Sequence, residues 1–222
     1  MNINEYIDHT ALKSSVTKED IEKLCNEALE HKFAAVCVNS TRVELAKKLL
    51  ANSDVNICTV VGFPIGASFK EVKAKEALMA IELGADEIDM VIDIQSLIDK
   101  DLDKVRQDIE HVLKAVHSKD KILKVIIETC LLNEIQKREV CLICKELKVD
   151  FVKTSTGFST GGATLEDVKF MKDIVGDSIK VKASGGVKNK EDAIAMIKAG
   201  ASRIGTSSGV SITQGEESSS TY

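Results

Sequence analysis

The amino-acid sequence predicts an α/β protein folded as a single (β/α)8 TIM barrel. Strand-like and helix-like segments alternate along the chain, and eight strands recur at roughly 28 residues per unit. Such runs of βα units imply parallel strands joined by helical crossovers. A flavodoxin-like or Rossmann sheet would use about five or six strands, and no G-x-G-x-x-G motif follows the first strand. No linker-like stretch divides the chain, so we expect one domain over residues 1–222.

The expected strands are short apolar runs that end in polar residues. They cover residues 4–10, 33–39, 55–63, 87–92, 122–129, 150–157, 179–183 and 202–206. The sixth of them is a strand that runs into a loop of Thr, Ser and Gly.

The expected helices begin at capping residues, and several end at glycine. Thr17 with Asp20 three residues on has the capping pattern, and Ser68 with Glu71 repeats it. Further helices are expected over about 43–50, 102–117, 133–147, 164–176 and 189–200, with a short last helix after Gly209. The polar tail, about residues 214–222, is expected to be mobile.

Composition favours a globular protein that acts on a small molecule. The net charge is −5, from 30 basic and 35 acidic residues, and no basic cluster appears, which argues against a nucleic-acid partner. No apolar run approaches the ~20 residues of a membrane span, and the N-terminus lacks the layout of a signal peptide. We therefore expect a cytoplasmic protein with no membrane partner.

The cysteines and histidines do not predict a metal site. Six cysteines without secretory features are expected to be free thiols, and Cys141 and Cys144 form a C-x-x-C inside a helical pattern with no second pair. The four histidines are scattered, without the tight spacing of zinc ligands. No metal or organic cofactor is expected.

Catalytic chemistry is expected at the C-terminal ends of the strands, where barrels of this kind carry their active sites. The residues in this region are Asp8, Asp89, Glu128, Lys153 and Lys182. On the fourth to seventh strands, alternation turns the apolar neighbours toward the helices and the charged residues toward the barrel interior. Charged groups inside successive strands are hard to explain as solvated surface.

A second set of charges lies deeper in the expected barrel. Glu87, Lys124 and Lys180 each come two residues before an end-of-strand charge. We expect them to form a supporting layer of ion pairs. The alternative is that some of them lie in water at the bottom rim.

Lys153 would ordinarily be read as a rim lysine paired with a carboxylate, but it has a cationic neighbour. The sixth and seventh strands are adjacent, ~4.8 Å apart, so Lys153 and Lys182 are expected to approach within several ångströms. An amine nucleophile must be neutral, and a second cation and partial burial both favour that form. We expect Lys153 to form a Schiff base with a carbonyl substrate. Asp89 and Glu128 can then transfer protons.

Two loops rich in Gly and Ser follow the seventh and eighth strands, where barrels often bind phosphate. Ser184-Gly185-Gly186 leads toward a helix near Asn189, and Gly205-Thr206-Ser207-Ser208-Gly209 leads into the last helix. Backbone N–H groups, hydroxyl groups and helix N-termini cradle phosphate. The sequence therefore predicts a phosphorylated small-molecule substrate.

Motifs along nearly the whole chain resemble those of the deoxyribose-phosphate aldolase family. They are Ile7-Asp8-His9-Thr10, Val36-Cys37-Val38-Asn39, Val61-Gly62-Phe63-Pro64, residues 84–91, 124–129, 150–158, 181–187 and 203–209. The most specific is Phe151-Val152-Lys153-Thr154-Ser155-Thr156-Gly157 together with Lys182-Ala183-Ser184-Gly185-Gly186. Ser14 and Ser40 depart from the family, because proline is expected there.

The resemblance implies a class I aldolase, a lyase that reversibly cleaves 2-deoxy-D-ribose 5-phosphate to D-glyceraldehyde 3-phosphate and acetaldehyde in deoxyribonucleotide catabolism. It implies that Lys153 forms the imine, that Lys182 tunes it, and that Asp89 with a water relays protons. The positions that match the family's phosphate contacts are Gly157, Gly185, Gly186, Gly205, Ser207 and Ser208. Cys37 matches a cysteine near the substrate pocket, and Tyr222 matches a terminal tyrosine thought to reach the site.

Two other readings stay open at this point. One is a different phosphate-binding barrel enzyme, an isomerase or synthase without covalent lysine chemistry. The other is a non-catalytic barrel that binds a sugar phosphate as a sensor. A homodimer is compatible with the sequence, which does not define the assembly.

Overall fold

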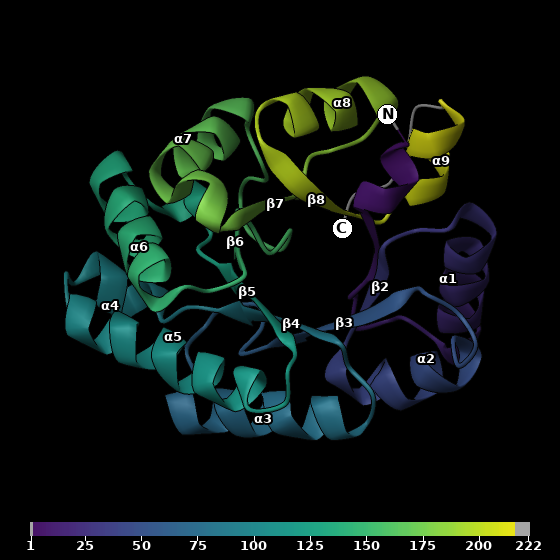
Figure 1. Ribbon diagram of the computed structural model, residues 1–222, viewed down its shortest axis with the longest axis horizontal. Coiled ribbons are helices and arrows are strands. Elements are labelled where there is room, and N and C mark those ends of the chain that lie inside the picture. The colour runs from purple at the N-terminus through teal and green to yellow at the C-terminus, as the bar shows by residue number, and fades with distance from the viewer. Residues whose placement is uncertain (1, 216–222) are drawn as a thin grey trace.

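The computed structural model describes residues 2–215, which form a closed eight-stranded barrel in the order β1 to β8, with helices around the outside (Figure 1). All neighbouring strands pair in parallel, and β1 closes the barrel against β8. The strands are β1 (Ile7–Ala11), β2 (Ala35–Val38), β3 (Asn56–Val61), β4 (Glu87–Val91), β5 (Ile122–Ile126), β6 (Phe151–Lys153), β7 (Lys180–Ser184) and β8 (Ala201–Thr206). The predicted single TIM barrel is confirmed.

The helices that cross over between strands cover the outer face of the barrel. They are α1 (Lys18–His31), α2 (Val43–Leu49), α3 (Lys70–Glu82), α4 (Ile94–Ile98), α5 (Leu102–His117), α6 (Glu134–Leu147), α7 (Leu165–Val175), α8 (Lys190–Lys198) and α9 (Gly209–Gln214). Short 3₁₀ turns lie at Ile3–Tyr6 (η1), Ser40–Arg42 (η2), Thr129–Leu131 (η3) and Gly176–Ser178 (η4). Within residues 2–215, every helix is too short or too polar to span a bilayer.

Most of the predicted capping residues begin their helices. Thr17 and Asp20 form a reciprocal capping box at α1, and Asn133, Thr164 and Asn189 each accept a backbone N–H at the start of α6, α7 and α8. The cap predicted at Ser68 is wrong, because α3 begins one residue later, after Phe69, whose side chain cannot accept a hydrogen bond. Each of the observed caps satisfies a backbone donor that the helix itself leaves unpaired.

Some boundaries differ from the expected ones for local reasons. The chain enters β1 through η1, so the first strand starts at Ile7 instead of residue 4. The five-residue α4 follows β4 and was not expected. β5 ends at Ile126 because Glu128 adopts a left-handed backbone conformation (φ 57°), which a strand does not continue through.

The main apolar core lies between the strands and the surrounding helices. Val125, Val152 and Val181 belong to it and are fully buried, which confirms the outward direction predicted for alternate strand residues. A smaller apolar cluster of Leu12, Ala35, Cys37, Cys58 and Val60 forms separately. The charged strand residues therefore face the interior of the barrel, as the alternation predicts.

A β-bulge interrupts the pairing of β7 with β8. Val181 pairs with Ala201 and Lys182 pairs with Arg203, so Ser202 is the extra residue. Bulges of this kind redirect side chains. Here the bulge places Arg203 level with Lys182.

Candidate active site

The interior of the barrel holds a buried cluster of charged side chains, which we call the charge cluster. Its members are Asp8, Glu87, Asp89, Lys124, Lys153, Lys182 and Arg203, contributed by β1, β4, β5, β6, β7 and β8. Buried charges are tolerated only when they are paired and hydrogen bonded. Every member of the charge cluster has at least one oppositely charged partner.

Asp89 is at the centre of the charge cluster. Its Oδ2 atom accepts from Lys153 Nζ at 2.7 Å and from Lys182 Nζ at 2.8 Å, and its Oδ1 atom accepts from Lys124 Nζ at 2.8 Å. The Asp89, Lys124 and Lys182 side chains are fully buried, whereas the Lys153 side chain is 4% exposed. The structure therefore brings together the three residues that were predicted to be catalytic, Asp89, Lys153 and Lys182.

Asp8 holds Lys182 from the opposite side. Its Oδ2 atom accepts from Lys182 Nζ at 2.5 Å, and its Oδ1 atom accepts from Arg203 Nη1 at 2.6 Å. Lys182 thus has two carboxylate partners. Lys153 has one, Asp89, within residues 2–215.

The predicted supporting layer of ion pairs is correct for Glu87 and Lys124 and wrong for Lys180. Lys124 Nζ lies 2.5 Å from Glu87 Oε2, and Arg203 donates to both oxygens of Glu87 at 3.2 Å. Lys180, the first residue of β7, is exposed, and its Nζ lies 5.4 Å from the centre of the Phe151 ring. Arg203 occupies the role that was predicted for Lys180.

The charge states of the cluster follow from this pairing. Burial raises the pKa of the Asp89 carboxyl, but the ammonium groups of Lys124, Lys153 and Lys182 outweigh burial and leave that pKa well below its usual range. Burial lowers the pKa of Lys182, but Asp8 and Asp89 outweigh it and leave the pKa well above the ordinary lysine value. Asp89 is therefore ionised and Lys182 is protonated at neutral pH.

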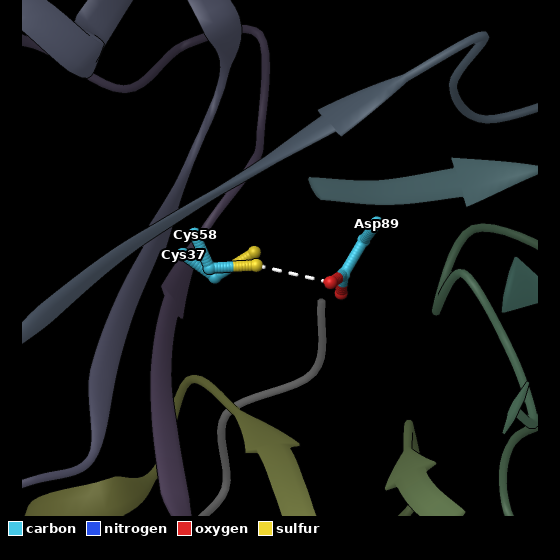
Figure 2. Close-up of side chains that lie close together, drawn as sticks. All are labelled: Cys37, Cys58 and Asp89. Atoms are coloured by element: carbon cyan, nitrogen blue, oxygen red, sulfur yellow. Dashed lines mark hydrogen bonds between the residues drawn. The ribbon is translucent and has the colours of Figure 1, made fainter. Parts of the chain in front are cut away.

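Cys37 and Cys58 lie side by side next to Asp89 (Figure 2). Cys58 Sγ donates to Asp89 Oδ1 at 3.0 Å, and Cys37, Cys58 and Asp89 could together offer three ligand atoms to a metal. The Asp89 oxygens already accept three ammonium groups, so a metal ion at this position would meet a strongly cationic environment. The donor set does not fit a metal centre.

Glu128 lies outside the charge cluster and organises the loop after β6. Its carboxylate accepts from the Thr156 hydroxyl at 2.5 Å and from the Thr156 backbone N–H at 3.3 Å. Burial raises the pKa of Glu128, and the hydrogen bonds from Thr156 only partly oppose this. The structure thus gives Glu128 a loop-holding contact with Thr156, and the ammonium group of Lys153 is near enough to act on its carboxylate electrostatically.

The glycine-rich loops enclose a cavity of about 300 Å³ beside the charge cluster. It is lined by Gly157, Ser159, Gly161, Gly162, Gly185, Gly186, Val187, Lys188, Thr206, Ser207 and Ser208. Five of the six predicted phosphate-contacting residues line it. The exception is Gly205, which does not line the cavity and packs against Ser184 and Lys182 instead. A Cβ atom at Gly205 would be 2.4 Å from Ser184 Oγ and 3.1 Å from Lys182 Cε.

Two residues of the site were missed by sequence reasoning. Arg203 was noticed only inside a family motif, and its charge on a strand was the signal that could have found it. Lys188 follows directly after Gly185-Gly186-Val187, and a cation next to a glycine-rich loop is a signal for an anion site. The predicted role of Tyr222 lies outside the described residues.

Comparisons with known proteins agree with the geometry. Residues 3–215 match the model of the DeoC/LacD family of aldolases. The chain is 57% identical over 217 residues to a deoxyribose-phosphate aldolase of Thermococcus gammatolerans, covering 97% of this chain and 96% of the relative. It is 56% identical over 222 residues to a deoxyribose-phosphate aldolase of Streptococcus gordonii, covering all of both chains. A solved tetrameric deoxyribose phosphate aldolase of Aeropyrum pernix superposes with a TM-score of 0.89 at 30% identity, covering 96% of this chain and 89% of that one.

Proposed function

Because the chain belongs to the DeoC/LacD family of aldolases, we propose that it cleaves 2-deoxy-D-ribose 5-phosphate reversibly to D-glyceraldehyde 3-phosphate and acetaldehyde. The reaction proceeds through a Schiff base on Lys153. The observation that carries the proposal is the unequal pairing of the two neighbouring lysines. Lys182 is fixed between Asp8 and Asp89, whereas Lys153 pairs with Asp89 alone among the described residues and keeps some exposure.

The unequal pairing separates a nucleophile from a fixed cation. Lys182 stays protonated between its two carboxylates and keeps a positive charge beside Lys153. The neutral Lys153 amine adds to the C1 aldehyde of the open-chain sugar, and loss of water gives the iminium ion. The permanent charge of Lys182 favours this path without entering a covalent bond.

Carbon–carbon cleavage then requires proton movement next to the imine. Removal of the C3 hydroxyl proton and breakage of the C2–C3 bond releases D-glyceraldehyde 3-phosphate, while the bonding electrons form an enamine on Lys153. Protonation at C2 and hydrolysis of the imine release acetaldehyde. Asp89, whose Oδ2 atom lies 2.7 Å from Lys153 Nζ, relays these protons through a water molecule in this mechanism.

The glycine-lined cavity is the proposed phosphate site. The loop after β6 reaches it at Gly157, four residues after Lys153, and Lys188 supplies a positive charge on its lining. A phosphate group held in this cavity would fix the distance between the phosphate end of the sugar and Lys153. Backbone N–H groups, serine hydroxyls and one ammonium group are a suitable chemistry for a dianion.

Borohydride reduction in the presence of acetaldehyde tests the Schiff base. The wild-type protein should gain an N-ethyl group at Lys153, found by peptide mass spectrometry, and Lys153→Met should gain none. Lys182→Leu should keep the fold and phosphate binding but lose most turnover. A wild-type protein that folds and is not modified would exclude the aldolase mechanism and favour a barrel enzyme without covalent lysine chemistry.

A further inference from the structure

Cys58 is a fully buried thiol of β3 that contacts the carboxylate of Asp89. Its Sγ atom donates to Asp89 Oδ1 at 3.0 Å and accepts from Lys124 Nζ at 3.2 Å. Figure 2 shows the Cys58 sulfur beside that of Cys37, with its hydrogen bond directed at the Asp89 carboxylate. Cys58 therefore belongs to the hydrogen-bond network of the charge cluster.

The pairing of β3 with β4 determines the side from which Cys58 reaches Asp89. Val60 pairs with Asp89, and Cys58 pairs with Glu87. Residues two apart in a strand face the same side, so Cys58 points into the barrel one position deeper than Val60. Lys153, in contrast, is the last residue of β6. Cys58 thus approaches Asp89 from the deeper side of the barrel interior, away from the end where the substrate is proposed to react.

The two oxygens of Asp89 have different partners. Oδ2 accepts from Lys153 and Lys182, whereas Oδ1 accepts from Lys124 and Cys58. In the proposed reaction the Lys153 nitrogen becomes part of an imine, so its hydrogen bond to Oδ2 changes during turnover. The contacts at Oδ1 involve no reacting atom. They can therefore hold the carboxylate in one orientation while the contacts at Oδ2 change.

A thiol suits this position because its surroundings are apolar on one side and charged on the other. Cys58 packs in the smaller apolar cluster with Ala35 and Val60, and its Sγ atom donates to Asp89. Cysteine behaves as a small apolar side chain with a weak S–H donor. Burial raises the pKa of the Cys58 thiol well above its usual range, so the sulfur keeps the hydrogen that it donates.

We propose that Cys58 is a positioning residue that fixes the Asp89 carboxylate through Oδ1 and so keeps Oδ2 directed at Lys153 during the proton relay. The inference rests on the proposed function, because the relay is a step of that reaction. Cys58 contacts no reacting atom in this mechanism. Its loss should therefore slow the proton transfers and leave both imine formation and phosphate binding in place.

Three substitutions separate the hydrogen bond from the space that the side chain fills. Cys58→Ala and Cys58→Val both remove the donor, one leaving a space and the other filling it, whereas Cys58→Ser keeps a donor. For cleavage of the phosphorylated sugar, kcat should fall about tenfold in the alanine and valine variants and return toward wild type with serine. KM should change little, because Cys58 does not line the phosphate cavity.

Deuterium exchange into acetaldehyde measures the proton transfer by itself. In D2O the iminium ion on Lys153 loses a C2 proton to the water held by Asp89, and the electrons of the C–H bond form the enamine. The enamine then takes a deuteron from the solvent, and hydrolysis returns labelled acetaldehyde, which NMR detects. Exchange should slow in Cys58→Ala and Cys58→Val by about the same factor as kcat. Borohydride trapping of acetaldehyde on Lys153 should reach the wild-type extent in both.

Cys144→Ala is the matched control, because Cys144 is a fully buried thiol of α6 in the main apolar core. It should keep the wild-type exchange rate. Wild-type exchange in Cys58→Val, or an equal loss in Cys58→Val and Cys58→Ser, would overturn the role of Cys58. If Cys58→Ala does not fold, this comparison of valine with serine decides alone. If borohydride and acetaldehyde do not modify the wild-type protein, the Schiff-base function itself fails, which is a separate result.

Discussion

Lys153 and Lys182 are directly paired residues of β6 and β7, and both donate to the same atom, Asp89 Oδ2, at 2.7 and 2.8 Å. One carboxylate oxygen therefore serves two neighbouring amines. Within residues 2–215, Lys182 alone of the two has a second carboxylate partner, Asp8. In the proposed mechanism this asymmetry divides the roles of two chemically identical side chains: Lys182 retains its proton and Lys153 reacts with the substrate.

Replacement of Lys188 should weaken binding of the phosphorylated substrate specifically. Lys188→Met should raise KM by roughly tenfold to a hundredfold, since a hydrogen bond to a charged group contributes about 1.5–3 kcal/mol. Steady-state kinetics with the phosphorylated sugar measure this. Lys190→Met is the matched control, because Lys190 starts α8 and does not line the cavity. Equal losses with unphosphorylated 2-deoxyribose would show that Lys188 does not act on the phosphate.

Gly162 should be intolerant of a side chain because backbone from the next loop packs against it. A Cβ atom at Gly162 would lie 2.5 Å from the carbonyl carbon of Gly185 and 2.9 Å from Gly186 N. We expect Gly162→Ala to lower the free energy of unfolding by about 1–3 kcal/mol and to raise KM by displacing the Gly185-Gly186 loop. Gly161→Ala is the comparison, because its Cβ would meet only the Cys130 side chain. The prediction is wrong if the two alanine variants behave alike in denaturant titration and kinetics.

Glu128 should make wild-type stability fall as pH rises. Its folded-state pKa is raised by burial, so the folded protein holds this proton more tightly than the unfolded chain, whose glutamate pKa is about 4.3. Stability from this group is complete below about pH 4.3 and is lost as pH rises through the folded-state pKa. Glu128→Gln should therefore gain stability relative to wild type between acidic and neutral pH, measured by chemical denaturation. A difference that is constant with pH would contradict the prediction.

Asp8 should have the opposite pH dependence. Burial acts to raise its pKa, but Lys182, Arg203 and Lys124 outweigh burial and lower it, so its stabilising effect is complete above the unfolded-state pKa of about 3.9. The effect is lost as pH falls below that value. Asp8→Asn should cost about 3–5 kcal/mol at neutral pH, because it leaves buried cations without a partner. The difference in the free energy of unfolding between Asp8→Asn and the wild type should shrink in acid. A difference that grows in acid would refute the prediction.

The barrel fold and the interior positions of Asp89, Lys153 and Lys182 could be predicted from the sequence, because the fold and these positions both follow from local sequence patterns. Alternation within a strand fixes which face a residue occupies, and it placed Asp89, Lys153 and Lys182 in the interior. The carboxyl ends of parallel strands converge, so these side chains meet. The prediction for Lys180 is wrong although Lys180 follows the same alternation. Lys180 is the exposed first residue of its strand, and its amine lies over the Phe151 ring.

Arg203 and Glu128 show what sequence patterns could not supply. The place of Arg203 depends on the bulge at Ser202, and a bulge arises from the pairing of two strands that no local pattern encodes. Glu128 was expected at the end of a strand beside Lys153. Glu128 lies past the end of the strand in a left-handed backbone conformation, and its carboxylate accepts from the Thr156 hydroxyl group, a contact that no local pattern predicts.

The contacts of Asp8 tie the arrangement around Lys182 to completion of folding. Asp8 joins Lys182 and Arg203 across 174 and 195 residues of sequence, at the seam where β1 meets β8. Contacts of such long sequence separation form late, because the entropy of closing a long loop opposes them. Lys182 therefore gains its contact with Asp8 only when β1 and β8 come together. The proposed reaction at Lys153 therefore requires the closed barrel, because that reaction uses the fixed charge of Lys182.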